Sequence, residues 1–200
     1  VDDNMIGNKK ALKRFLPELI AWQKERRYPF EFSTEASVNL ADDGELLGLL
    51  RAANFFAVFV GIETPDPETL VATSKKQNTR RDLVASINKI YGAGMFVTAG
   101  FIVGFDGEKS GAGRAITAFI EEAAIPVCMV GLLYALPNTQ LTRRLAKEGR
   151  LFPNHDIMLD QGGDQCTAGL NFETTRPRSE IIRDCRSVVG SVYEAGAYFP

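Results

Sequence analysis

The sequence lacks most of the residue patterns that would assign it to a common class of site. Its 200 residues contain one histidine and three cysteines. The cysteines, Cys128, Cys166 and Cys185, are too far apart to supply the closely spaced ligands of zinc and iron–sulfur centres. They are also too few for a disulfide framework. Their small number predicts a protein of the reducing cytoplasm. Because the single histidine, His155, falls in a polar loop, Ser–His, Cys–His and zinc-hydrolase chemistry are not expected.

Charge and hydropathy exclude two further classes. The formal net charge of −2 gives no reason to expect nucleic acid or an anionic membrane as a partner. No apolar run approaches the roughly 20 residues that span a bilayer. Neither Gly-x-Gly-x-x-Gly nor Gly-Lys-Ser/Thr occurs, so no phosphate-binding loop is predicted.

Apolar strands and amphipathic helices alternate along the chain. The opening Val1-Asp2-Asp3-Asn4 is typical of the end of a strand, and we predict four strands after it, over 30–35, 55–62, 96–105 and 127–136. Helices are expected over 8–26, from Asp42, from Asp66, over 79–94, 115–124, 138–149 and 179–194. Pro17 should kink or restart the first of them. This alternation predicts an α/β fold with a parallel sheet and right-handed crossovers.

The pattern changes after residue 153. Residues 154–175 are polar and glycine-rich without a clear period, and one more helix follows. We therefore expect a barrel-like part over 1–153 and a helical C-terminal extension over 154–200 that is too small to fold alone.

Polar side chains follow each predicted strand. Asp3 and Asn4 end the first, and Glu35, Glu63 and Asp106 follow the next three. Ligands of parallel α/β sheets bind at these carboxyl ends. One such residue could simply begin a solvated loop, but the recurrence after each strand favours a binding site.

Two glycine-containing motifs sharpen this hypothesis. In Gly61-Ile62-Glu63, the glycine permits close approach of a ligand, and the carboxylate could accept both hydroxyls of a ribose. In the segment from Gly100 to Gly104, glycines within a strand would let a flat adenine lie against the backbone. Tight packing of a helix on a buried strand is the alternative explanation for the second motif.

Taken together and in order, these segments resemble the radical S-adenosylmethionine enzymes, and in particular the branch that often carries an N-terminal cobalamin-binding domain. The resemblance covers almost the whole chain. It is carried by Val1-Asp2-Asp3-Asn4, Phe30-Glu31-Phe32-Ser33-Thr34-Glu35, Gly61-Ile62-Glu63-Thr64, Gln77-Asn78-Thr79-Arg80, Gly100-Phe101-Ile102-Val103-Gly104-Phe105-Asp106, Val130-Gly131-Leu132-Leu133 and, in the tail, Leu170-Asn171-Phe172.

The resemblance implies a fold, cofactors and a set of contacts. The fold would be a partial (β/α) barrel, and the family's Cys-x-x-x-Cys-x-x-Cys loop holds a 4Fe–4S cluster that cleaves S-adenosylmethionine reductively. Asp3 and Asn4 match the position near the methionine amino group. Glu35 and Glu63, with Gly61, could reach the methionyl and ribose parts. The adenine would be lined by the remaining candidates, which are Gly100, Ile102, Val103, Leu133 and Tyr134.

The sequence departs from the family at the reactive centre. No segment has the Cys-x-x-x-Cys-x-x-Cys spacing, and the first barrel strand has no counterpart. We therefore interpret the chain as part of a longer enzyme, inactive as given, with no catalytic residue or metal ligand of its own. An open strand edge near Val1 would pair with the missing N-terminal part or with a second copy. The loop from Gly107 to Gly113 looks altered, so we assign no role to Asp106 or Glu108.

Two other functions stay open at this stage. A barrel that never had a cluster could act as a binding or scaffold module. An unrelated enzyme could hold Mg²⁺ on its strand-end carboxylates, since that ion prefers oxygen ligands. The substrate and the oligomeric state are not specified by the sequence.

Overall fold

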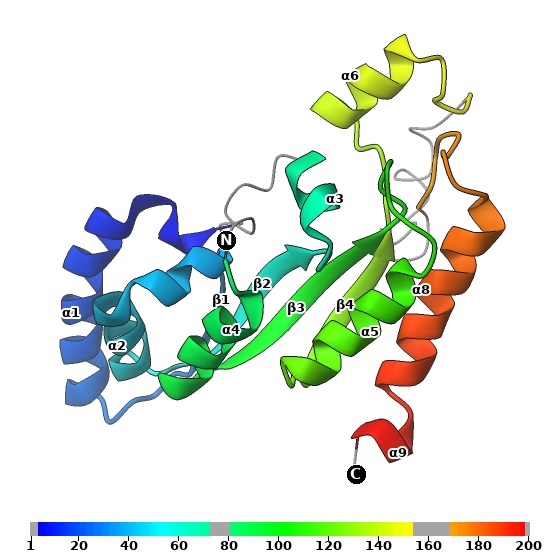
Figure 1. Cartoon of the computed structure of the whole chain (residues 1–200). Coiled ribbons are helices and arrows are strands. Elements are labelled where there is room, and N and C mark those ends of the chain that lie inside the picture. The colour runs from blue at the N-terminus through cyan, green and yellow to red at the C-terminus, as the bar shows by residue number, and fades with distance from the viewer. Residues whose placement is uncertain (1–3, 73–80, 154–168, 199–200) are drawn as a thin grey trace. The chain divides into compact units, whose positions relative to one another are not determined.

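The structure is a computed structural model that describes residues 4–72, 81–153 and 169–198. It is built around one four-stranded sheet. Its strands run in sequence order and lie side by side in Figure 1. They are β1 (Phe32–Glu35), β2 (Phe55–Glu63), β3 (Phe96–Val103) and β4 (Val127–Leu132). The α/β class and the parallel sheet predicted from the alternating pattern are confirmed.

Helices connect and follow these strands. They are η1 (Met5–Asn8), α1 (Lys9–Glu25), η2 (Val38–Asp42), α2 (Gly44–Ala52), α3 (Pro67–Ala72), α4 (Leu83–Gly92), α5 (Ala112–Glu122), α6 (Gln140–Lys147), α8 (Arg178–Val192) and α9 (Ala195–Tyr198). Within the described ranges, no helix is long and apolar enough to cross a membrane.

Side-chain caps fix where several helices begin. Asp66, Asp82 and Thr139 each accept a hydrogen bond from the backbone N–H three residues later, as the sequence predicted for Asp66. The prediction that Asp42 caps α2 is wrong. Asp43 accepts from Leu46 N at 3.1 Å instead. Asp42 ends η2, and its carboxylate pairs with an arginine.

Pro17 lies inside α1 without ending it. The helix runs from Lys9 to Glu25, so of the kink or restart predicted at this proline, the restart does not occur. A proline in this position removes one backbone hydrogen bond. The buried face formed by Leu12, Leu16 and Gln23 supports the helix across that gap.

The chain divides into two compact units. The first comprises 1–62, 75–100 and 121–128, and the second comprises 63–74, 101–120 and 129–200. The division predicted at residue 153 is a different one, and it stays a prediction.

In the first unit, helices pack against one another around the amino-terminal strands. α1 packs on α2, and η2 packs on α4. Gln23 is fully buried and donates to the backbone oxygens of Phe30 and Ala53, at 2.7 and 3.3 Å. It therefore holds the segment before β1 to the end of α2.

In the second unit, the C-terminal segment packs closely on the residues that follow β3. A side chain added at Gly113, in α5, would meet the backbone oxygen of Asp184 in α8 at 2.8 Å. These two helices run side by side in Figure 1. Phe101 and Phe119 form an edge-to-face pair with centroids 6.0 Å apart, which fixes β3 to α5.

Candidate functional site

Asn4 and Glu35 lie near the carboxyl end of β1 in the first unit. Glu35 is the last residue of the strand, and its side chain is exposed. Asn4 precedes η1, and its Oδ1 accepts from Ser37 N at 3.1 Å. This bond ties the start of the described chain to the loop just after Glu35. Asp3 lies outside the described residues.

Gly100 accommodates an aromatic side chain from the neighbouring strand. A Cβ at this position would lie 2.9 Å from Cζ of Phe59, so the ring of Phe59 covers the glycine. A ligand that lay along β3 here would therefore contact this ring. Gly61, on β2, is half-buried and marks the carboxyl end of that strand.

In the second unit, Glu63 adopts a backbone conformation that L-residues rarely take. Its φ is 68°, in the left-handed region, at the last position of β2. Such a conformation costs about 1–3 kcal/mol and occurs where the surroundings impose it, often at binding sites. Thr64 follows it, buried, and its hydroxyl accepts from Asp66 N at 3.2 Å. The turn therefore holds the carboxylate of Glu63 at the end of the strand.

The four adenine candidates other than Gly100 fall into two pairs by the burial of their side chains. The Val103 and Leu133 side chains belong to the core, with exposures of 0% and 7%. Ile102 and Tyr134 are half-buried and have side-chain surface to offer a ligand. Leu133 N donates to Val103 O at 2.9 Å, and Leu133 O accepts from Leu170 N at 2.7 Å. An adenine here would therefore pack on side chains more than it would pair with these backbone groups.

Asp106 and Glu108, to which the sequence assigned no role, are both held by arginines. Arg150 donates to both oxygens of Asp106, at 2.7 and 2.9 Å, and Arg144 lies 2.8 Å from the same carboxylate. The hydrogen bonds from Arg150 lower the pKa of Asp106, although partial burial opposes them. Asp106 is thereby kept ionised and fixed in an ion-pair cluster.

Glu108 is buried, with 1% of its side chain exposed. It accepts from Gly104 N at 2.9 Å and pairs with Arg176 at 3.1 Å. Burial raises its pKa, against the effect of these two partners. Since Arg176 also binds Asp184 in α8 at 2.6 Å, this cluster connects the loop after β3 to the C-terminal helix.

Asn171 contacts the segment just after β4 and Gly169 contacts the last residue of β4, and sequence reasoning missed both as site-supporting residues. Asn171 Oδ1 accepts from Ala135 N at 2.8 Å, and its Nδ2 donates to Ala135 O at 3.1 Å. A side chain at Gly169 would overlap Leu132. The only sequence signal was that Leu170-Asn171-Phe172 matched the family tail.

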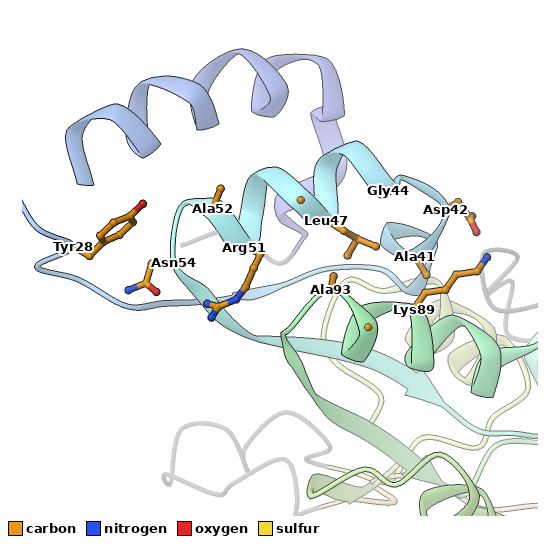
Figure 2. Close-up of a pocket in the computed structure, with 12 residues that line it drawn as sticks. Tyr28, Ala41, Asp42, Gly44, Leu47, Arg51, Ala52, Asn54, Lys89 and Ala93 are labelled. Atoms are coloured by element: carbon orange, nitrogen blue, oxygen red, sulfur yellow. The ribbon is translucent and has the colours of Figure 1, made fainter. Parts of the chain in front are cut away.

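A surface groove in the first unit lies away from the candidate residues. Figure 2 shows it between α2 and α4, with the side chains of Arg51 and Lys89 at its walls. Asn54, which also lines it, directly precedes β2 and so marks the amino end of that strand. Ligands of parallel sheets bind at the opposite, carboxyl ends, so we do not assign the cofactor to this groove.

The described residues offer no metal centre. Among residues 4–72, 81–153 and 169–198, no group of three His, Cys, Asp or Glu side chains could hold an ion. The Mg²⁺ hypothesis therefore gains no support from this part of the chain. The residues present also do not fit a 4Fe–4S cluster, since the sequence has no closely spaced cysteines.

Two curated proteins are similar over nearly the whole chain. An uncharacterized methyltransferase of Synechocystis sp. is 48% identical over 198 residues, which are 99% of this chain and 36% of that protein. The hopanoid C-2 methylase of Rhodopseudomonas palustris is 42% identical over 197 residues, 98% of this chain and 35% of that protein. The chain thus spans about a third of the length of these relatives. A family described as a domain of unknown function (DUF4070) matches residues 139–200.

Solved structures share the fold at low sequence identity. The radical S-adenosylmethionine methyltransferase TsrM from Kitasatospora setae, with cobalamin and a 4Fe–4S cluster bound, aligns with a TM-score of 0.59 at 20% identity. This alignment covers 68% of this chain and 27% of TsrM. Coproporphyrinogen III oxidase (HemN) from Escherichia coli, a radical SAM enzyme, aligns with a TM-score of 0.58 at 14% identity, over 90% of this chain and 37% of HemN.

The fold is therefore that of part of a radical S-adenosylmethionine barrel. Its relatives over almost the whole chain are methyltransferases. The resemblance in fold to radical S-adenosylmethionine enzymes, predicted from the sequence motifs, is confirmed.

Proposed function

We propose that this chain supplies the S-adenosylmethionine-binding part of a radical S-adenosylmethionine methyltransferase. The observation that carries the proposal is the 42% identity to a hopanoid C-2 methylase over 98% of the chain. A hopanoid is accordingly the first substrate to test. Because its sequence has no cluster-binding cysteines, the chain by itself is expected to leave S-adenosylmethionine uncleaved.

The side chains that would hold S-adenosylmethionine are those that lie at or near the carboxyl ends of strands and keep exposed surface. In the second unit, Glu63 is a carboxylate suited to the hydroxyl donors of the ribose part. In the first unit, Glu35 is by itself suited to the ammonium donor of the methionyl part. Ile102 and Tyr134 offer half-buried side-chain surface for the adenine. The imposed left-handed conformation of Glu63 supports this assignment, because backbone strain clusters at ligand sites.

The remaining cofactors and partners belong to the rest of the proposed enzyme. A 4Fe–4S cluster would be held by cysteines outside this chain, and it supplies the electron for cleavage of S-adenosylmethionine. Cobalamin, bound in the TsrM structure, would come with a separate domain. We propose that the N-terminal part of the same protein is the partner of this chain, and that the enzyme works in the cytoplasm.

The test begins with the codons upstream of Val1. We expect the reading frame to continue into a Cys-x-x-x-Cys-x-x-Cys loop. The longer protein, reconstituted anaerobically, should form 5′-deoxyadenosine or S-adenosylhomocysteine and add a methyl group to a hopanoid, as mass spectrometry would detect. A stop codon at this point would overturn the proposal and favour a binding module without a cluster.

A matched pair of variants tests the assigned residues. Glu63→Gln in the longer protein should raise the Kd for S-adenosylmethionine by about tenfold, since charged hydrogen bonds contribute about 1.5–3 kcal/mol. Glu122→Gln, at an exposed position that ends α5, should leave it unchanged. Equal affinities in the two variants would contradict the role of Glu63.

A further inference from the structure

We propose that Asn171 is a positioning residue for the adenosyl part of the cofactor site. In this role its side chain forms hydrogen bonds with the backbone that follows β4, as a neighbouring strand would. This inference rests on the proposed function, because it concerns the same site. It gives the C-terminal segment a role in positioning the cofactor site. The family of unknown function matches this segment, over residues 139–200.

The contact itself is a complete pair of hydrogen bonds. The amide oxygen of Asn171 accepts from Ala135 N at 2.8 Å, and its amide nitrogen donates to Ala135 O at 3.1 Å. Asn171 is 3% exposed, so water cannot readily replace either bond. A buried backbone group left without its partner costs about 1–3 kcal/mol. The side chain therefore satisfies both polar groups of one residue, as an adjacent strand would.

The backbone on the other side of Tyr134 is held by the same segment. Leu133 O accepts from Leu170 N at 2.7 Å, and Leu133 N donates to Val103 O at 2.9 Å. Tyr134 thus lies between two residues whose backbones are both fixed. Its half-buried side chain is one of the two with surface available to an adenine. The direction of this side chain is consequently set by Leu170 and Asn171.

Two glycines let the segment come this close. A side chain at Gly169 would overlap Leu132, the last residue of β4. Gly104 has a φ of 112°, and a Cβ there would lie 2.8 Å from Leu170 Cδ2. The segment therefore rests on the carboxyl ends of β3 and β4 together, within the second unit.

The first experiment tests the contact on the chain as given. Hydrogen exchange, followed by mass spectrometry, is measured on a peptide that contains Leu133 to Leu136, in the wild type and in Asn171→Ala. Exchange at Ala135 should rise at least tenfold in the variant. Asn88→Ala, exposed on α4, is the control and should leave that peptide unchanged. Unchanged exchange in Asn171→Ala would overturn the positioning role.

The second experiment tests the consequence for the cofactor in the longer, cluster-loaded protein. Asn171→Ala should raise the Kd of S-adenosylhomocysteine by about tenfold and leave the Kd of methionine, which has no adenosyl part, within twofold. Equal losses for both ligands, or none, would overturn the proposal. If the variant does not fold, Asn171→Asp, which keeps the acceptor for Ala135 N, provides the same comparison. A wild type that binds neither ligand would refute the proposed function itself.

Discussion

Arg150 holds Asp106 with both of its terminal nitrogens, one on each carboxylate oxygen, at 2.7 and 2.9 Å. The same guanidinium lies over the ring of Phe172, 5.7 Å from its centroid, and its Nε donates to Glu173 O at 2.8 Å. Its side chain is 17% exposed, so this is a largely buried, bidentate pair. One arginine thereby joins the loop after β3 to the C-terminal segment.

Loss of this pair should destabilise the chain in a pH-dependent way. The pKa of Asp106 is lowered in the folded state by Arg150. Its contribution is therefore fully present above the unfolded-state pKa of about 4 and is lost as the pH falls through the lower folded-state value. Asp106→Asn should cost about 1–3 kcal/mol near neutral pH and flatten the acid-side decline. Urea unfolding at several pH values measures both effects.

Asp42→Asn provides the control for that prediction. Asp42 pairs with Arg81 at 2.6 Å, but its side chain is 52% exposed. Exposed pairs contribute about 0–1 kcal/mol, so this variant should remain near the wild type at neutral pH. A larger loss in Asp42→Asn than in Asp106→Asn would contradict our interpretation of the buried pair.

Glu63→Gly should make the chain more stable. Glu63 has a φ of 68°, which glycine adopts without steric cost. Removing the strain should raise the free energy of unfolding by about 1 kcal/mol. Ala124→Gly, at a φ of 49° and away from the strand ends, should stabilise similarly. In the longer protein, only Glu63→Gly should also weaken binding of S-adenosylmethionine. If both variants bind it normally, the strain at Glu63 has no connection with the ligand.

Gly100 and Phe59 should behave as an energetically coupled pair. Gly100→Ala brings a methyl group 2.9 Å from Phe59 Cζ and should cost about 1–3 kcal/mol by overpacking. In a Phe59→Ala background, the same substitution should cost almost nothing. A double-mutant cycle by urea unfolding gives the coupling energy directly. Additive effects would show that the ring moves away freely.

The outer edge of β1 should support self-association of the chain as given. Phe32 N and Ala36 N donate towards β2, so the N–H groups of Ser33 and Glu35 face the other way. Size-exclusion chromatography should show concentration-dependent dimers. Ser33→Pro, which removes an outward donor only, should reduce them, because an edge without donors pairs poorly. A monomer at high concentration in the wild type would contradict this prediction.

The strands were predictable because burial on both faces leaves long apolar runs, as in β2 and β3. The end of β4 was not predictable from such a run. The apolar run continues to Leu136, but β4 ends at Leu132, and Leu133 then pairs with Val103 and Leu170. The prediction of the N-cap of α2 failed for a local reason. Asp42 and Asp43 are adjacent, and the capping-box pattern with Glu45 three residues later points to Asp42, although Asp43 provides the cap.

The candidate site was predictable only where its chemistry lies at strand ends. Glu35 and Glu63 do end β1 and β2, as the sequence indicated. The support from Asn171 could not be found from spacing, since its partner Ala135 lies 36 positions earlier. The ring that covers Gly100 also comes from another strand. Such contacts are decided by the packing of elements and not by local pattern.

The contact between Asn171 and Ala135, 36 positions apart in the sequence, has a consequence for folding during synthesis. During synthesis, residues 133–135 emerge well before Leu170 and Asn171 do, and translation proceeds at about 5–20 residues per second. Until then, the polar groups of Ala135 must be satisfied by water or by a transient partner. The backbone just after β4 is thus completed late, and a ribosome paused before residue 169 would expose the polar groups of Ala135 without the partner that Asn171 provides.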